Sequence, residues 1–207
     1  MPKRNSVKTY GVDQYYHVYN RGVNKQDIFL EPEDRFFFLS LLKRHLSDEP
    51  ETDSHRRPVA KFDDEIELVA FCLMPNHFHM LFYLKDPQGL VHLMRSTMTS
   101  YTMYFNKKYL RTGGLYESVF LASRITNDAY LWHISRYIHL NPMDIGQNFR
   151  SYPYSSIDYF VGNKRASWVH PEKLVHTTTE KQQYLEFVED YQSMHEDMKL
   201  LKNILAS

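Results

Sequence analysis

The chain has 207 residues, of which 43% are apolar, and its 25 basic and 25 acidic residues leave no formal net charge. This size suits one domain with a sizeable core, alone or with a tail, and no apolar run approaches the ~20 residues of a membrane span. The neutral balance argues against a protein that coats nucleic acid by bulk charge. The N-terminus has no apolar segment typical of a signal peptide, and the single cysteine, at position 72, fits a reducing cytoplasm.

The first half of the chain predicts three strands and one helix. Residues 15–22, YYHVYNRG, alternate Tyr16, Val18 and Asn20 against His17 and Tyr19, which is typical of a strand. Residues 32–46 begin with a proline and two acids and end in basic residues, as helices do. A polar loop with two prolines follows at 47–65. The β-rich runs 66–74 and 77–84, joined by a Pro-Asn turn signal, predict a hairpin.

The second half predicts two more helices around a fourth strand. Residues 89–110 carry apolar side chains at helical spacing, and a Gly-Gly pair at 113–114 follows them. We expect a strand at 118–125 and a helix at 127–142, with Asn127 or Asp128 as N-cap and Pro142 as its end. The order β-α-β-β-α-β-α predicts an α+β, ferredoxin-like sandwich: an antiparallel sheet with helices on one face, and the last helix against the sheet or beside it.

The C-terminal tail differs in character from the rest of the chain. Its apolar residues recur in alternating steps of three and four, an a/d stripe over about three heptads. These residues are Tyr184, Phe187, Tyr191, Met194, Met198, Leu201 and Leu205. The stripe suits a helix docked on the domain, and a homodimer contact is the alternative. We predict a first unit at 1–162 and an extension with an amphipathic helix at 163–207.

Charge is distributed unevenly along the chain. Residues 91–124 contain five basic residues and one acid, whereas residues 48–67 contain eight acids and three bases. A neutral protein with such a basic stripe can bind phosphates on one face, and solvated surfaces that average out are the alternative.

The segment MPNHFHMLFYL, residues 74–84, places two histidines at the head of a strand. Residues i and i+2 of a strand point to the same face, so His77 and His79 share one face while Phe78 points to the core. Two imidazoles on one face can bind one cation. An H-x-H pair alone is weak evidence, however, and histidines with other partners or in solvent are the more common outcome.

The predicted helix 127–142 adds polar side chains that could complete such a site. His133, Tyr137 and Asn141 are spaced i, i+4 and i+8 and line one side of it. The adjacent apolar stripe, which should press the helix onto the sheet, consists of Leu131, Ile134 and Ile138. Tyr137 would then lie at the margin of the core, where it could face the histidine pair or be an ordinary amphipathic tyrosine. Tyr130, two turns earlier, is its nearest competitor as a nucleophile.

At this point the sequence resembles a known family. LMPNHFHMLFYL is similar to the HUH motif, histidine-hydrophobic-histidine, of single-tyrosine transposases, and SRYIHLNP is similar to the helix that carries their tyrosine nucleophile. YHVYNRGVNKQDIF and YPYSSIDYF are similar to the first strand and the post-catalytic segment of the REP-associated tyrosine transposases. The resemblance covers roughly residues 10–162, with the polar loop at 48–65 as an insertion.

The resemblance implies a metal-dependent reaction on DNA. It makes His77, His79 and Asn141 ligands of a divalent cation, Mg²⁺ or Mn²⁺, and makes Tyr137 the nucleophile; His133 matches no family role. It implies cleavage and rejoining of single-stranded DNA at hairpins with an unpaired flank, through a 5′-phosphotyrosine, by a bacterial, nucleoid-associated protein. Two nitrogens and an amide oxygen suit Mn²⁺ by ligand softness.

Several further side chains are candidates for holding DNA. Those that could contact the backbone are Asn20, Arg21, Lys107, Lys108, Arg111, Arg124 and Arg136, and those that could stack on bases are Tyr15, Tyr16, Tyr19, Tyr101 and Tyr104. An HUH replication initiator or relaxase is one alternative, usually on a larger chain. A non-catalytic nucleic-acid-binding module on the same sandwich is another, but it would not need Tyr137 together with the three ligands. A zinc hydrolase has no H-E-x-x-H motif to support it.

Overall fold

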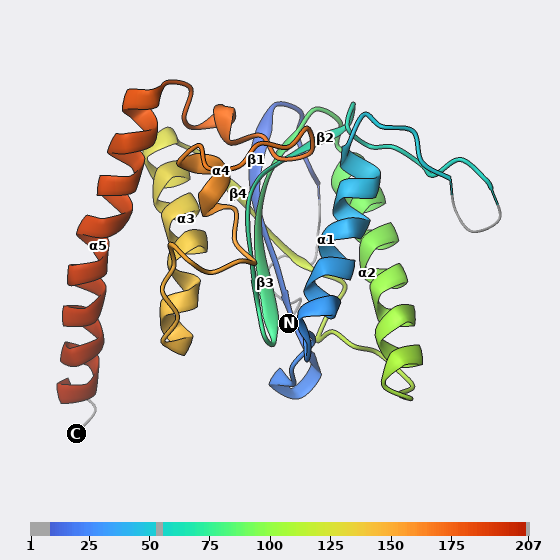
Figure 1. Ribbon diagram of the computed structural model, residues 1–207, viewed down its shortest axis with the longest axis horizontal. Helices are drawn as coiled ribbons and strands as arrows, with labels where there is room; N and C mark the ends of the chain where they lie inside the picture. Colours follow the sequence, from blue (N-terminus) through green and yellow to red (C-terminus); the bar gives the residue numbers. More distant parts are fainter. Residues whose placement is uncertain (1–8, 53–55, 206–207) are drawn as a thin grey trace.

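The computed structural model describes the backbone of residues 9–52 and 56–205, and their side chains other than those of 128, 129 and 192–205. Within these residues one antiparallel sheet has the strand order β2-β3-β1-β4. Its strands are β1 Gln14–Arg21, β2 Ile66–Met74, β3 His77–Leu84 and β4 Leu121–Ile125. Helices α1 Pro32–Leu46 and α2 Gly89–Lys108 cover one face, α3 Asp128–Leu140 lies on the other, and α5 Thr178–Leu205 lies outside α3 (Figure 1). The predicted ferredoxin-like sandwich is confirmed.

Three predicted elements are shorter than the sequence suggested. The helix expected at 127–142 spans Asp128–Leu140. The second helix ends at Lys108, and Leu110 then adopts a positive φ of 52° that a helix cannot contain. The fourth strand begins at Leu121, because the carbonyls of Ser118 and Val119 accept hydrogen bonds from the Asn20 side chain (2.8 and 3.0 Å). The short helices η1 Val23–Lys25, η2 Asn141–Ile145, α4 Ile157–Phe160 and η3 Pro171–Lys173 were not predicted. No helix in the described part of the chain is long and apolar enough to cross a membrane.

Side-chain alternation along β3 divides the interior into two cores. Phe78 and the residues at even spacing after it pack against α1 and α2 in one core. Leu81 and Tyr83 belong to the other core, between the sheet and α3. The histidine pair therefore starts a row that faces α3, as the predicted pleat requires.

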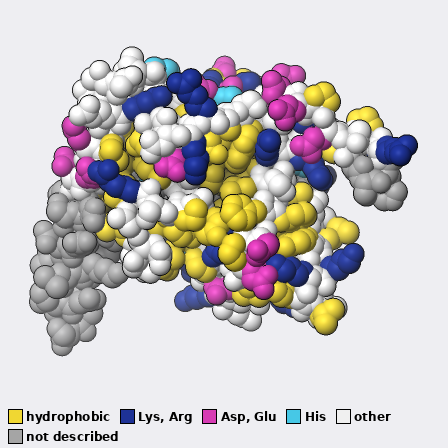
Figure 2. Space-filling model, in the orientation of Figure 1, with side chains coloured by type: hydrophobic (Ala, Val, Ile, Leu, Met, Phe, Trp, Pro, Cys, Tyr) yellow, Lys and Arg dark blue, Asp and Glu magenta, His cyan; other side chains and the backbone are white. Residues whose placement is uncertain are grey.

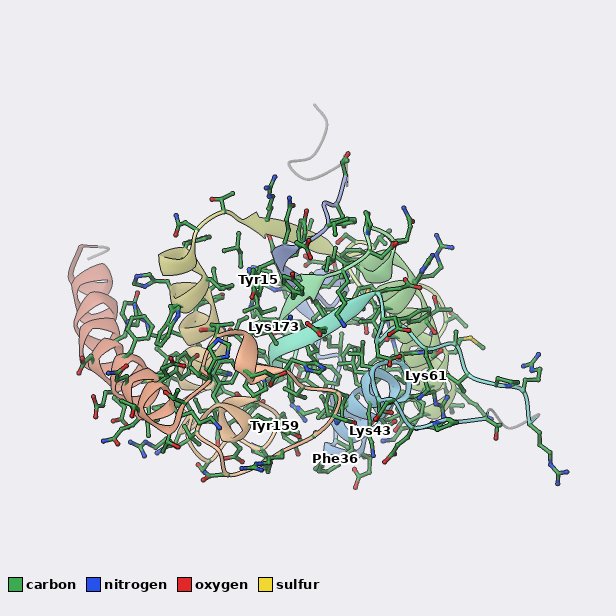
Figure 3. The ribbon with its side chains drawn as sticks, turned by 90° about the horizontal axis from the view of Figure 1, so that it is seen from above. Tyr15, Phe36, Lys43, Lys61, Tyr159 and Lys173 are labelled. Carbon is green, nitrogen blue, oxygen red and sulfur yellow. The ribbon has the colours of Figure 1, made fainter. Side chains whose placement is uncertain are left out.

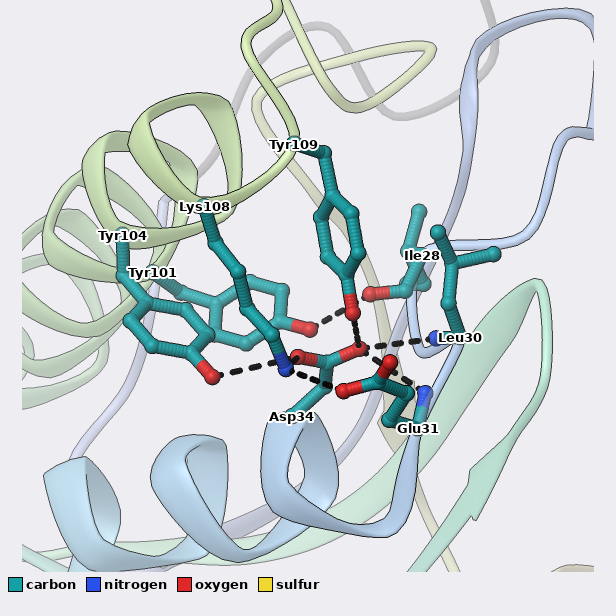
Figure 4. A network of polar contacts seen from close by, with 8 residues as sticks. All are labelled: Ile28, Leu30, Glu31, Asp34, Tyr101, Tyr104, Lys108 and Tyr109. Atoms are coloured by element: carbon teal, nitrogen blue, oxygen red, sulfur yellow. Dashed lines mark hydrogen bonds and ion pairs between the residues drawn. The ribbon is translucent and has the colours of Figure 1, made fainter.

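A buried carboxylate joins α1 to α2 on the first face (Figure 4). Asp34, with no exposed surface, accepts hydrogen bonds from the backbone N–H groups of Leu30 (2.9 Å) and Glu31 (3.0 Å) at the start of α1. From α2 and the residue after it, Tyr104 (3.1 Å), Lys108 (2.8 Å) and Tyr109 (2.7 Å) also donate to this carboxylate. These hydrogen bonds hold the pKa of Asp34 below its usual range against the effect of burial. The carboxylate is therefore ionised and bridges the two helices.

The outer edge of β2 is covered by later parts of the chain. Ser156 donates its N–H to the carbonyl of Phe71 (2.9 Å), and His170 donates to that of Leu68 (2.8 Å). Lys173 binds Glu67 (2.8 Å) and lies 4.1 Å from the ring centroid of Tyr83; Tyr15 and Lys173 lie near one another in Figure 3. Segments beyond residue 162 thus contribute to the same cores as the first unit.

Helix α5 docks on α3 with the first part of the predicted tail stripe. Tyr184 and Val188 are fully buried, and the rings of Tyr184 and Phe187 pack against Trp132 with centroids 5.5 and 5.6 Å apart. This is the docked-helix alternative for the described side chains. The described side chains do not include Met194, Met198, Leu201 and Leu205, so a dimer contact there stays a prediction.

Hydrophobic side chains also gather over the middle of the face seen in Figure 2.

Candidate active site

A cavity of about 710 Å³ lies between the sheet and α3. Strands β1, β3 and β4 form its floor, and α3 with η2 forms one wall. Its polar lining includes His17, Tyr19, Arg21, His77, His79, Glu117, Tyr130, Tyr137, Asn141 and Asp144. Both predicted histidines, the predicted tyrosine and the predicted amide therefore lie in one cavity.

His77 is oriented by a hydrogen bond at one ring nitrogen and approaches an amide oxygen with the other. Its Nδ1 lies 2.6 Å from Oδ1 of Asn76, and its Nε2 lies 3.4 Å from Oδ1 of Asn141. The Asn141 amide is itself fixed, because its Nδ2 donates to the carbonyl of Tyr137 (2.8 Å). Burial lowers the pKa of His77, so the ring is neutral at pH 7. An imidazole nitrogen and an amide oxygen therefore face one another across the cavity.

His79 lies between Tyr137 and a third histidine. The Tyr137 hydroxyl is 3.4 Å from Nε2 of His79, and Nδ1 of His79 is 2.9 Å from Nε2 of His17. Burial holds the pKa of His79 well below its usual value and lowers that of His17 to about 4. Tyr137 is 46% exposed, and partial burial raises the pKa of its hydroxyl. The phenol is protonated at neutral pH, so it needs activation to act as a nucleophile.

The donor set around the cavity fits a divalent cation. Two neutral imidazoles and one amide oxygen are ligands that Mn²⁺ accepts readily and Mg²⁺ accepts less well. The approach of His77 Nε2 to Asn141 Oδ1 shows that a sheet residue and a helix residue converge on one point. In the described part of the chain, no group of three or more His, Cys, Asp or Glu side chains could hold a metal, and the third donor beside the two imidazoles is the Asn141 amide oxygen.

Comparison with known proteins finds a matching family model and a similar solved structure. Residues 48–141 match the model of the family described as "Transposase IS200 like", and this span contains both histidines, Tyr137 and Asn141. This span is slightly under half of the chain, and over these residues the chain is similar to that family. A solved structure described as a REP-associated tyrosine transposase bound to a REP hairpin is similar to it, with a TM-score of 0.52 and 16% identity over 80% of this chain and 90% of that one. At this identity the likeness shows a shared fold. No curated protein matches the chain.

Arg136 and His133 face α5 rather than the cavity. Arg136 is only 8% exposed, and its guanidinium donates to the carbonyl of Phe187 (3.1 Å) and to Nδ1 of His133 (2.7 Å). It also lies over the rings of Phe187 and Tyr191, 3.9 and 4.1 Å from their centroids. Both side chains therefore support the helix that carries Tyr137.

The other predicted DNA contacts fall into two groups. Arg21 lines the cavity and is exposed, and Lys107 and Arg124 are exposed outside it. The remaining three have protein partners: Lys108 binds Glu31 and Asp34, Arg111 donates to Asn106 (3.3 Å) and Gln26 (3.5 Å), and Asn20 is 3% exposed. The first group is therefore better placed to reach a phosphate.

Among the aromatic candidates, Tyr19 is the one that lines the cavity. Tyr16 and Tyr101 are buried, Tyr104 stacks on Phe37 with centroids 4.0 Å apart, and Tyr15 contacts Tyr83. The structure also places three ionisable residues in the cavity that the sequence did not single out: His17, Glu117 and Asp144. Only His17 had a signal, because it alternates with the core residues Tyr16 and Val18 and so must lie on the histidine face.

Proposed function

We propose that this protein is a transposase that cleaves and rejoins single-stranded DNA through a covalent link to Tyr137, with a divalent cation at His77, His79 and Asn141. The convergence of four groups from β3, α3 and η2 carries the proposal. Tyr137 approaches His79 and Asn141 approaches His77, each at 3.4 Å, in one cavity open to solvent. A non-catalytic binding module would have no need for this arrangement.

The reaction is a transesterification at phosphorus. The Tyr137 oxygen forms a bond to the phosphorus and the bond from phosphorus to the 3′ oxygen breaks; the phenol loses its proton and the departing 3′ oxygen gains one. The product is a 5′-phosphotyrosine, whose phosphodiester lets a second 3′-hydroxyl rejoin the strand by the reverse step. A cation bound in the site would polarise the scissile phosphate, a contribution of several kcal/mol. Arg21 is placed to hold a neighbouring phosphate.

The proposed substrate is a DNA hairpin with an unpaired flank. The protein in the similar structure is bound to a REP hairpin, and its fold is shared over 80% of this chain. The cavity offers an exposed arginine for phosphate and the ring of Tyr19 for an unpaired base. A single strand fits this combination better than a duplex, whose bases are not open to stacking.

Detection of the covalent intermediate tests the proposal. A library of labelled hairpins with single-stranded flanks, incubated with the protein and Mn²⁺, should give a protein–DNA adduct that survives boiling in detergent. Tyr137→Phe removes only the oxygen and should give no adduct, while still binding the hairpin.

Tyr130 supplies the matched control, because it lines the same cavity and is 49% exposed. It lies two turns before Tyr137, about 10 Å further along the helix axis at ~1.5 Å per residue. Tyr130→Phe should therefore keep the adduct. An adduct that persists in Tyr137→Phe and is lost in Tyr130→Phe would identify the other tyrosine as the nucleophile, and no adduct from any hairpin would favour a binding module.

A further inference from the structure

We propose that His17 is a positioning residue that holds His79 in the one tautomer able to bind a cation. The purpose of this contact rests on the proposed function, but the contact itself involves only residues of this chain. His17 Nε2 and His79 Nδ1 are 2.9 Å apart, and the two side chains are 9% and 7% exposed. Water therefore has little access to this pair of nitrogens.

A single proton lies between the two facing nitrogens, and its position decides what His79 can do. A neutral imidazole carries one N–H, and its other nitrogen has a free lone pair. If the proton belongs to Nδ1 of His79, then Nε2 of His79 presents a lone pair to the cavity. If the proton belongs to Nε2 of His17, then His79 carries its own proton on Nε2, and that atom cannot be a ligand.

His77 shows how the same requirement is met with a different partner. Oδ1 of Asn76 and Oδ1 of Asn141 can both only accept, and the much shorter contact, 2.6 Å at Nδ1 against 3.4 Å at Nε2, assigns the single His77 proton to Nδ1 and leaves Nε2 free. The Asn76 amide is fixed because its Nδ2 donates to the carbonyl of Lys25 (3.1 Å). For His79 the structure gives Nδ1 a contact with an imidazole instead of an amide. For Nε2 of His79 to be free in the same way, Nδ1 of His79 must donate and Nε2 of His17 must accept.

One further contact favours that assignment, and ring stacking holds His17 in place. The Tyr137 hydroxyl, a ready donor, faces Nε2 of His79 at 3.4 Å, where a lone pair would receive it. The ring of His17 is stacked with those of Tyr19 and His79, with centroids 5.2 and 5.1 Å apart, which restricts its rotation. The strand register brings His17 close to His79: Tyr19 of β1 pairs with His79 of β3, so His17, two residues before Tyr19, is the diagonal neighbour of His79.

Two substitutions at position 17 separate acceptance of the proton from mere packing. His17→Leu fills space but removes the acceptor, whereas His17→Gln places an amide oxygen near the original Nε2. Imidazole ¹⁵N spectra of the metal-free chain at pH 7.5 report the tautomer of His79 directly. We expect the Nδ1–H form in the wild type and in His17→Gln, and a mixture with the Nε2–H form in His17→Leu.

Titration with Mn²⁺ gives the second readout on the same three proteins. Loss of the partner of a metal-binding histidine typically costs 10–100-fold in metal affinity, so His17→Leu should bind Mn²⁺ that much more weakly. His17→Gln should recover most of the affinity. Thermal unfolding of each variant checks that the chain is folded.

The two readouts keep this proposal distinct from the proposed function. A wild-type His79 with its proton on Nε2 would overturn the assignment. So would an equal loss of Mn²⁺ affinity in both variants with an unchanged tautomer, because His17 would then only fill space. A wild-type chain with the Nδ1–H tautomer but no Mn²⁺ binding would support the assignment of His17 and refute the proposed cation site.

Discussion

Replacing Arg136 by methionine should loosen α5 from α3 without removing a DNA contact. The substitution keeps an unbranched apolar stem but deletes the guanidinium, which donates to the Phe187 carbonyl and lies between the rings of Phe187 and Tyr191. A hydrogen bond from a charged group contributes about 1.5–3 kcal/mol, and a cation–π contact about 0.5–2 kcal/mol. The low ends of these ranges are appropriate, because a buried arginine also carries a desolvation cost. One hydrogen bond and two cation–π contacts then contribute about 2.5 kcal/mol.

Amide hydrogen exchange measures this loss at the helix where it occurs. A decrease of about 2.5 kcal/mol in the free energy of local opening corresponds to roughly 70-fold faster exchange, since about 1.4 kcal/mol is a factor of ten. We expect this acceleration for amides at 181–191 in α5. The dependence of hairpin affinity on salt should stay as in the wild type, because the guanidinium is not available to a phosphate.

Lys107→Met is the matched control, because Lys107 is an exposed cation at the end of α2. It should leave the exchange of α5 unchanged. The reasoning about Arg136 would be refuted if Arg136→Met left that exchange unchanged and instead lowered the slope of log affinity against log salt by about 0.7–0.9, the effect of one lost phosphate contact.

Three other predictions follow from the same structure. Asp34→Asn should lower the free energy of unfolding by about 3–5 kcal/mol in urea titrations, because it leaves donors facing an amide in a buried site, whereas the exposed neighbour Glu33→Gln should change it by less than about 0.5 kcal/mol. The free energy of unfolding should fall as pH decreases from about 6.5, by up to ~1.4 kcal/mol per pH unit for each of the buried histidines His17 and His139. Burial lowers their pKa values in the folded chain to about 4 and about 3, so the unfolded chain binds protons at a higher pH than the folded chain does. Urea titrations at pH 7.5 and 5.5 that give equal stabilities would contradict this. Arg21→Ala should weaken hairpin binding and reduce its salt slope by about 0.7–0.9 in fluorescence anisotropy, and an unchanged slope would remove Arg21 from the phosphate contacts.

The parts of the fold that are set by local periodicity were predictable from the sequence. Alternation in 77–84 places His77 and His79 on one face whatever the strand pairs with, and helical spacing places Tyr137 beside Asn141. The structure brings these four residues into one cavity, while their roles stay predictions. The strand order followed from the sequence of elements, because short connections leave few topologies for this pattern.

The partners of individual charged side chains were not predictable, because they depend on contacts distant in sequence. Lys108 is bound by Asp34, 74 residues earlier, and Arg136 packs on Phe187, 51 residues later. A basic side chain in a sequence gives no sign of which carboxylate or ring it will meet. The pairing of His17 with His79 likewise depends on the register of β1 against β3, which alternation alone does not fix.

The position of Tyr137 is set from the opposite side of its helix. Successive residues of a helix are about 100° apart, so His139 points away from the cavity when Tyr137 points into it. His139 is fully buried, with one ring nitrogen 2.8 Å from Ser156 Oγ and the other 2.7 Å from the Tyr184 hydroxyl. Ser156 Oγ in turn accepts from the N–H of Phe71 in β2 (2.8 Å). A chain of hydrogen bonds thus ties the helix that carries Tyr137 to the sheet that carries the histidines, and α5 closes its outer end. Because Tyr137 and His79 come from different elements, their separation depends on this buried contact, which makes the segment after residue 162 part of what holds the site together.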